Sequence, residues 1–403
     1  MVSYTLDPPA QRRLGKFFDA VGSIFKNAKQ RAAFALYGLG ILGEGERKSV
    51  EPIAARACAH IEEVDALHQR LLHFLGPAKW SDHDVRLKAA RYAVAALEEQ
   101  GPIEAAIIDD TGFLKQGTHS VGVKRQYTGS AGKVTNCQVA VSLTLANQWA
   151  HVPVDMQLYL PDTWAQDPKK RQEGQIPKEV PFQTKPQIAL KMLQQAKEDR
   201  LPLGRVLADC GYGDNAPFRE GVRALGLDYG LGIQAVTKVY GVSAKGFRHP
   251  KPICVGLWAG QLRNRDFRRL SWREGTKKQL SSRFVFRRVV VASDPRQEEQ
   301  WLVVERSEEK APKLQYYLMT GARTMTKKVL VRALKERYRT EQMYQEAKGG
   351  LGLDHYEGRR YTGWHHHVSV VLCCYSFVIV ERVRHFPPSA RRTYQTHAQR
   401  LAA

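Results

Sequence analysis

Two aspartates of this chain stand at the ends of short apolar runs, where a carboxylate is unusual. Asp110 follows the apolar residues 105–108 and Asp109, and Asp209 follows residues 206–208. Short apolar runs bounded by turn residues are typical of buried strands. We therefore expect two core strands that each finish in an acidic side chain.

A third acid, Glu341, lies in a segment of helical periodicity, residues 327–348. It comes eleven residues after Leu330 and seven after Leu334. A helix turns by about 100° per residue, so this spacing returns the glutamate to the stripe that the leucines occupy. The pattern predicts that Glu341 points into the protein.

Three converging carboxylates would need a counter-charge. Two carboxylates about 4 Å apart repel by roughly 4 kcal/mol at an effective dielectric constant near 20. Oxygen ligands suit Mg²⁺ or Mn²⁺, and two such ions can hold the attacking and leaving oxygens of a phosphodiester. We therefore predict that Asp110, Asp209 and Glu341 bind two Mg²⁺ or Mn²⁺ ions in a phosphoryl-transfer site.

The net charge indicates the partner. Lysine and arginine number 62 against 40 acidic residues, which gives a formal charge of +22. A strongly basic chain is attracted to polyphosphate, so DNA or RNA is the expected partner. A sugar-cleaving enzyme that uses paired carboxylates is a poor fit to so much positive charge.

The sequence favours a cytoplasmic protein. Residues 1–13 contain no apolar segment of the kind found in a signal peptide. The longest apolar run, residues 368–380, is short for a bilayer and is typical of a buried helix. The six cysteines form no C-x-x-C pair. We expect neither a membrane span nor a structural zinc site.

The character of the sequence changes along the chain. We expect an all-helical domain (residues 1–100), an alternating α/β part (101–233), a β-rich insertion (234–318), a second α/β part with the Glu341 helix (319–385) and a basic tail (386–403). Basic clusters in the first part suit phosphate contacts, although a solvated helix face explains any one of them equally well.

The first α/β part has its own pattern of elements. Residues 119–145 read as a hairpin, and residues 229–233 as a strand. Asn215 can cap a helix between the strand that ends at Asp209 and this last strand. Residues 151–185 are polar and contain prolines, so we expect a long surface loop there.

Several ordered motifs of this chain resemble those of the DDE transposases. The matching segments are residues 107–113 (IIDDTGF), 120–123 (SVGV), 125–127 (RQY), 136–142 (NCQVAVS), 158–161 (LYLP), 207–213 (LADCGYG), 337–341 (RYRTE) and 348–359 (KGGLGLDHYEGR). The resemblance covers residues 50–385. Among these transposases, the chain is most similar to the IS4-like group and, within it, to the IS701 family.

The resemblance implies a fold and an activity. The fold would be an RNase H-like core, a mixed sheet flanked by helices, with a β-rich insertion between the second aspartate and the glutamate. Asp110, Asp209 and Glu341 match the catalytic, metal-binding triad. The protein would cut transposon ends and join the 3′ hydroxyl to target DNA. It would act as a homodimer on the inverted-repeat ends, in the cytoplasm at the nucleoid.

The resemblance also extends to the helix that carries the glutamate. Arg337, Glu341 and Lys348 match three positions of the signature of the IS4-like group, and Arg337 and Lys348 would contact DNA. The tyrosine expected three residues before the arginine is Leu334, and the basic residue expected four after the glutamate is Gln345.

Each acid has an alternative interpretation. Asp109 is a lesser candidate than Asp110 for the first ligand, since adjacent strand residues face opposite sides. Asp209 could instead cap the turn that follows it. Glu341 could pair with Arg337 on an exposed helix face. For the whole chain, the alternatives are a catalytically idle DNA-binding regulator derived from a transposase and an RNase H-like nuclease that joins no strands.

The insertion offers further candidates for DNA contact. Its arginines and lysines suit phosphates, and its tryptophans could stack on a base, although core packing is the commoner role. The residues are Arg263, Arg265, Arg268, Arg269, Lys277, Lys278, Trp258, Trp272 and Trp301. The adjacent His365, His366 and His367 diverge at a helix start, so we expect a capping or DNA-facing role for them rather than a metal site.

Overall fold

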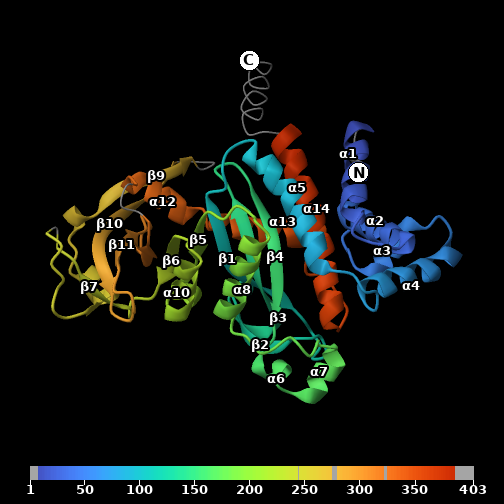
Figure 1. Ribbon diagram of the computed structural model, residues 1–403, viewed down its shortest axis with the longest axis horizontal. Helices are drawn as coiled ribbons and strands as arrows, with labels where there is room; N and C mark the ends of the chain where they lie inside the picture. The colour runs from blue at the N-terminus through green and yellow to red at the C-terminus, as the bar shows by residue number, and fades with distance from the viewer. Residues whose placement is uncertain (1–7, 244, 275–278, 322–324, 386–403) are drawn as a thin grey trace, which may run out of the picture. The chain divides into compact units, whose positions relative to one another are not determined.

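The computed structural model describes residues 8–243, 245–274, 279–321 and 325–385 (Figure 1). Contacts divide the chain into two compact units. Unit 1 comprises residues 1–102, 110–183 and 340–403, and unit 2 comprises residues 103–109 and 184–339. The five parts expected from the sequence stay predictions, and the units combine segments that are far apart along the chain.

Unit 1 joins the N-terminal helices to a small sheet. Its helices are α1 (Pro8–Gly22), α2 (Ala28–Leu42), α3 (Val50–Ala57), α4 (Val64–Leu75), α5 (Asp82–Glu98), α6 (Asp162–Ala165), α7 (Pro168–Gly174) and α14 (Tyr361–His385). Its strands are β2 (Lys124–Thr128), β3 (Lys133–Ala146) and β4 (His151–Tyr159). The strand order is β2-β3-β1, with β4 paired to β3, and β1 spans Ala105–Leu114. The helical character expected of the first hundred residues is confirmed.

Helix α14 is the centre of the unit 1 core. It packs against α2, α5 and β4. The buried Arg86 of α5 donates to the Ser369 hydroxyl of α14 at 2.6 Å and pairs with Asp155 of β4 at 2.9 Å. By length and composition α14 could cross a membrane, but 83% of its apolar window is buried inside the protein. It is a core helix, as the run 368–380 predicted.

The three histidines of α14 lie inside this core, so the expected DNA-facing role is wrong, whereas His366 bonds the last carbonyl oxygen of α4 as a capping residue would. His365, His366 and His367 are each less than 5% exposed. Helix packing surrounds the first turns of α14 on several sides, and the ring nitrogens bond to neighbouring segments. His366 Nδ1 lies 2.9 Å from the Leu75 carbonyl oxygen, and His367 Nδ1 lies 2.9 Å from the Tyr37 hydroxyl. Burial lowers the pKa of all three imidazoles, to about 4 for His366 and His367.

The surface loop expected over residues 151–185 is also wrong in its first half. Strand β4 runs antiparallel to β3 from His151 to Tyr159, and α6 and α7 follow. Its first four residues, 151–154, are all buried, and buried and half-buried side chains alternate from Val154 to Tyr159. Pro153 concealed this period-two pattern, because a proline within a run argues against a strand. The proline is tolerated at an irregularity, where the register of β3 shifts between Leu143 and Thr144.

Unit 2 is a mixed sheet with helices packed on it. Its strands are the first part of β1 and β5 (Arg205–Ala208), β6 (Tyr229–Ile233), β7 (Lys238–Gly241), β8 (Ile253–Cys254), β9 (Arg268–Glu274), β10 (Gln279–Val291), β11 (Glu299–Arg306) and β12 (Leu314–Met319). Its helices are α8 (Lys185–Glu198), α9 (Cys210–Gly213), α10 (Ala216–Ala224), α11 (Val255–Gly260) and α12 (Lys327–Lys335). The strand over residues 229–233 and the Asn215 cap of α10 are confirmed.

The strand order of unit 2 is β1-β5-β6-β12-β11-β10-β7-β8, with β9 on β10. Strands β1, β5 and β6 are parallel, and β12 is antiparallel to β6. Helix α12 closes one part of the core, where Leu330 and Leu334 pack with Phe284, Val303 and Met319. The segment expected as a β-rich insertion therefore continues the sheet through β12.

Candidate active site

The first two acids lie on β1, and the structure gives them different surroundings. Asp109 is 8% exposed, and Asp110 is half-buried. Within unit 2, Arg337 Nη1 donates to Asp109 Oδ2 at 2.9 Å. Successive side chains of a strand point to opposite faces, so Asp110 points away from the face of β1 on which Asp109 lies. The charge of Asp109 is thus compensated from within the protein.

Asp209 directly follows β5, the parallel neighbour of β1 in unit 2. Ile107 pairs with Leu207, so Asp109 and Asp209 each stand two residues beyond paired positions. The expectation that a strand ends at the acid is confirmed for Asp209, but it is wrong for Asp110, because β1 continues beyond Asp110 to Leu114. Asp209 is also the N-cap of α9, since its Oδ1 accepts the Gly211 N–H at 2.9 Å. One carboxylate oxygen thus fixes the turn, and the other can still serve as a ligand.

Glu341 is exposed and does not lie on the leucine stripe, so the inward orientation expected from periodicity is wrong. The reason is a break in the helix. Helix α12 ends at Lys335, and a new helix, α13 (Tyr338–Leu351), starts three residues later. The break resets the phase of the apolar stripe, which continues in α13 through the buried Met343 and Ala347. Glu341 stands in the first turn of α13, where the helix dipole favours a carboxylate.

Lys348 attaches α13 to the second part of β1, inside unit 1. Its ammonium donates to the Thr111 hydroxyl at 2.8 Å and to the Gly112 carbonyl oxygen at 2.6 Å. Burial lowers the pKa of this amine. Glu341 precedes Lys348 by seven residues and therefore lies on the same side of α13, two turns away. The helix side that faces β1 beside Asp110 is thus the side that carries Glu341.

The signature residues Arg337 and Lys348 both have partners on β1. Arg337 binds Asp109, and Lys348 binds the backbone and side chain that follow Asp110. The sequence assigned both cations to DNA and gave no sign of these contacts, because the contacts join segments more than 200 residues apart. Their contact with DNA stays a prediction.

The chemistry of the three acids fits hard divalent cations. All three offer carboxylate oxygens, the donors that Mg²⁺ and Mn²⁺ prefer. Within the described part of the chain, no three His, Cys, Asp or Glu side chains form a compact group of metal ligands. Metal binding by Asp110, Asp209 and Glu341 therefore stays a prediction that rests on ligand chemistry and strand register.

The four arginines predicted to bind DNA through the insertion are exposed: Arg263, Arg265, Arg268 and Arg269. Arg269 Nε pairs with Glu308 at 2.9 Å, which offsets part of its charge. Lys277 and Lys278 lie outside the described residues.

The three tryptophans of the insertion are half-buried. Trp272 meets Phe284 edge to face, and Trp301 meets Phe286 in the same way, so both pack against the unit 2 core. Trp258 lies beside Gly241, where an added Cβ would come within 3.1 Å of its ring. These contacts favour the packing role, and base stacking stays a prediction.

Comparisons with known proteins place the chain in a family. The family model described as "DDE superfamily endonuclease" matches residues 20–279, more than half of the chain, and the chain therefore belongs to this family. A second model, "Transposase DDE domain", matches residues 184–377. A curated relative from Microchaete diplosiphon, "Probable transposase for insertion sequence element IS701", is 27% identical over 214 residues. The match covers 53% of this chain and 51% of the relative, so the chain matches about half of that protein's length. The resemblance inferred from the motifs is confirmed.

Proposed function

We propose that this chain is a DNA transposase that cuts transposon ends and joins the freed 3′ hydroxyl to target DNA. The observation that carries the proposal is the parallel pairing of β1 and β5, because it sets Asp109 and Asp209 at equivalent positions of adjacent strands, with Asp110 next along β1. The family of DDE endonucleases and the relative's printed name support the same activity.

The fold we propose for the catalytic core is RNase H-like. Its support is the strand order β4-β3-β1 in unit 1 together with β1-β5-β6 in unit 2, with the latter three parallel. In this core Asp110, Asp209 and Glu341 would hold two Mg²⁺ or Mn²⁺ ions. Bound divalent metal would supply activation of the attacking oxygen and stabilisation of charge on the transferred phosphate.

The protein's own groups position the acids. Lys348 holds α13 against β1, and Gly211 orients the Asp209 carboxylate. Arg337 neutralises Asp109, so that one fewer uncompensated carboxylate borders the proposed site. DNA would be held by the basic surface, and two protomers would bring two inverted-repeat ends together in the cytoplasm, at the nucleoid.

The proposal is tested by separating binding from cutting. Asp110→Ala, Asp209→Ala and Glu341→Ala should each abolish cleavage of a DNA carrying the element's inverted repeat, while binding measured in Ca²⁺ stays near wild type. Joining is followed with a pre-cut end and a plasmid target. Cleavage by all three variants, or cleavage that persists in a chelator, would refute the proposal. Cutting without joining would favour a nuclease, and binding by a wild-type chain that never cuts would favour an idle regulator.

A further inference from the structure

Asp209 is carried by a very short helix. Helix α9 has four residues, Cys210–Gly213, with Asp209 as its N-cap. So short a helix has too few internal hydrogen bonds to fix its own orientation. The direction of the Asp209 carboxylate therefore depends on what holds the other end of α9.

The C-terminal end of α9, at Gly213, packs closely against β6. An added Cβ at Gly213 would come within 1.8 Å of the Gly232 carbonyl oxygen of β6. An added Cβ at Gly232 would lie 3.0 Å from the Cys210 backbone nitrogen. The two glycines thus allow α9 to lie directly on β6, and this contact fixes the distance of the helix from the sheet.

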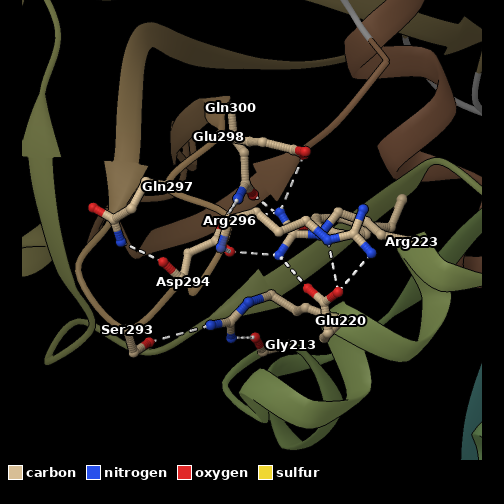
Figure 2. A network of polar contacts seen from close by, with 11 residues as sticks. Gly213, Glu220, Arg223, Ser293, Asp294, Arg296, Gln297, Glu298 and Gln300 are labelled. Carbon is tan, nitrogen blue, oxygen red and sulfur yellow. Dashed lines mark hydrogen bonds and ion pairs between the residues drawn. The ribbon is translucent and has the colours of Figure 1, made fainter.

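The same end of α9 is also hydrogen-bonded to a buried guanidinium. Arg219 of α10 is 2% exposed. Its Nη1 donates to the Gly213 carbonyl oxygen at 2.5 Å, and its Nη2 donates to the Ser293 hydroxyl at 3.4 Å, as the contacts of Gly213 and Ser293 in Figure 2 show. Its Nε has no hydrogen-bond partner among the described residues. Burial lowers the pKa of this guanidinium, although arginine stays protonated in proteins.

The second anchor of Arg219 belongs to a turn that is itself rigid. Ser293 precedes Asp294, which is 1% exposed. Arg223, one turn beyond Arg219 on α10, binds both carboxylate oxygens of Asp294, at 2.8 Å and 2.6 Å (Figure 2). Gln300 donates to the same carboxylate at 3.0 Å. The turn between β10 and β11 is therefore fixed to α10, and Arg219 spans from it to α9.

A buried cation that donates only to neutral oxygens is costly, and within the described part of the protein the charge of Arg219 is offset only by acids that it does not contact, Asp294 and Asp214. Three acids of this network, Asp294, Glu220 and Glu298, pair with Arg223 instead. This desolvation cost has a structural reason if the planar guanidinium group is needed to fix the orientation of α9.

We propose that Arg219 is a positioning residue for Asp209: by binding the Gly213 carbonyl oxygen, it fixes α9 in the orientation that directs the Asp209 carboxylate to metal. This inference rests on the proposed function. Arg219 is buried and acts through its contact with α9.

The test compares Arg219→Met, Arg219→Lys and Arg223→Met in the full-length chain. Methionine keeps much of the apolar stem and removes the fork, and lysine keeps the charge without the fork. Arg223→Met disrupts the same network without touching α9, so it is the matched control for lost stability. Mn²⁺ affinity is measured without DNA, from the electron paramagnetic resonance signal of free Mn²⁺. The Mg²⁺ concentration for half-maximal cleavage and the midpoint of thermal unfolding are measured in parallel.

We expect Arg219→Met to weaken Mn²⁺ binding by about tenfold, as is usual when a residue that orients a metal ligand is lost. The half-saturating Mg²⁺ concentration should rise by a similar factor, and Arg219→Lys should show a smaller loss. Arg223→Met loosens only the distant Ser293 anchor and leaves the Arg219–Gly213 contact, so it should unfold at lower temperature but weaken Mn²⁺ binding far less than Arg219→Met. If Arg219→Met does not fold, the Mn²⁺ affinity of Arg219→Lys tests the inference in its place. A folded Arg219 variant with wild-type Mn²⁺ affinity would overturn the inference.

Asp209→Ala separates this inference from the proposed function. If Asp209→Ala loses Mn²⁺ affinity and Arg219→Met does not, the inference alone is wrong. If Asp209→Ala binds Mn²⁺ and cuts DNA like the wild type, both the metal site and the inference are wrong.

Discussion

The neighbouring Asp109 and Asp110 differ in one respect that decides how each should respond to mutation. Asp109 is paired with Arg337, and Asp110 projects from the other face of the strand. A sequence alone could rank these two acids only by motif. The ion pair gives a physical reason to assign the structural role to Asp109 and the proposed metal-binding role to Asp110.

We predict that Asp109→Asn lowers the free energy of unfolding by on the order of 1–3 kcal/mol, because it removes the ion pair with Arg337. Cleavage should fall only moderately. Asp110→Asn should abolish cleavage and leave stability close to wild type. Urea unfolding and cleavage of end DNA measure the two effects, and the reverse pattern would exchange the two assignments.

The buried histidines of α14 give a pH dependence with a defined sign. The folded-state pKa of His366 and of His367 is lowered to about 4, below the ordinary value near 6.5. The unfolded chain therefore binds protons first as the pH falls, and folding loses stability between about pH 6.5 and pH 4. Each histidine contributes roughly 2–4 kcal/mol, present above the unfolded pKa and lost through this window.

Denaturant unfolding at a series of pH values tests this prediction. A double variant, His366→Gln with His367→Gln, should show a shallower loss of stability below pH 6.5 than the wild type. His73→Gln is the matched control, since His73 is an exposed histidine of the same unit. Equal slopes for the double variant and the wild type would contradict the buried, neutral state of these rings.

At the scale of elements, the insertion's β9 region offers a graded test of DNA contact. Arg268 and Arg269 are adjacent and exposed, but Arg269 is paired with Glu308. Loss of one phosphate contact reduces the slope of log binding constant against log salt by about 0.9. We predict that Arg268→Ala reduces the slope by about one and that Arg269→Ala reduces it less. Binding titrations at several salt concentrations measure these slopes. Unchanged slopes for both variants would indicate that DNA does not contact β9.

The elements that the sequence predicted well were those with a local signal. The strand over residues 229–233 has turn residues on both sides, and Asn215 is a recognisable helix cap. The failures had non-local causes. Pro153 masked a strand that its partner β3 stabilises, and the break after Lys335 follows from packing that a helical period cannot reveal. The two aspartates were found because an acid at the end of an apolar run is a local feature, although β1 continues past Asp110. The direction in which Glu341 points depends on the helix break, which is not a local feature of the sequence.

At the scale of the whole molecule, the first hundred residues depend on a helix from much later in the chain. Helices α2 and α5 pack against α14, whose buried side chains complete their core. We predict that a fragment of residues 1–102 is unfolded by circular dichroism and amide exchange. The same fragment joined by a flexible linker to residues 361–385 should gain helix content. A fully folded 1–102 fragment would contradict the dependence on α14.

The same dependence orders events during synthesis. Roughly 260 residues separate the end of α5 from the start of α14, so at 5–20 residues per second the N-terminal helices wait about 13–50 s on the ribosome for their partner. During that time Phe17 and Tyr37 lack the α14 side chains that contact them, Phe377 and His367. We expect chaperones to bind a nascent chain in this state. It also cannot present a finished unit 1 to DNA until α14 has left the exit tunnel, so translation itself delays the first encounter with a substrate.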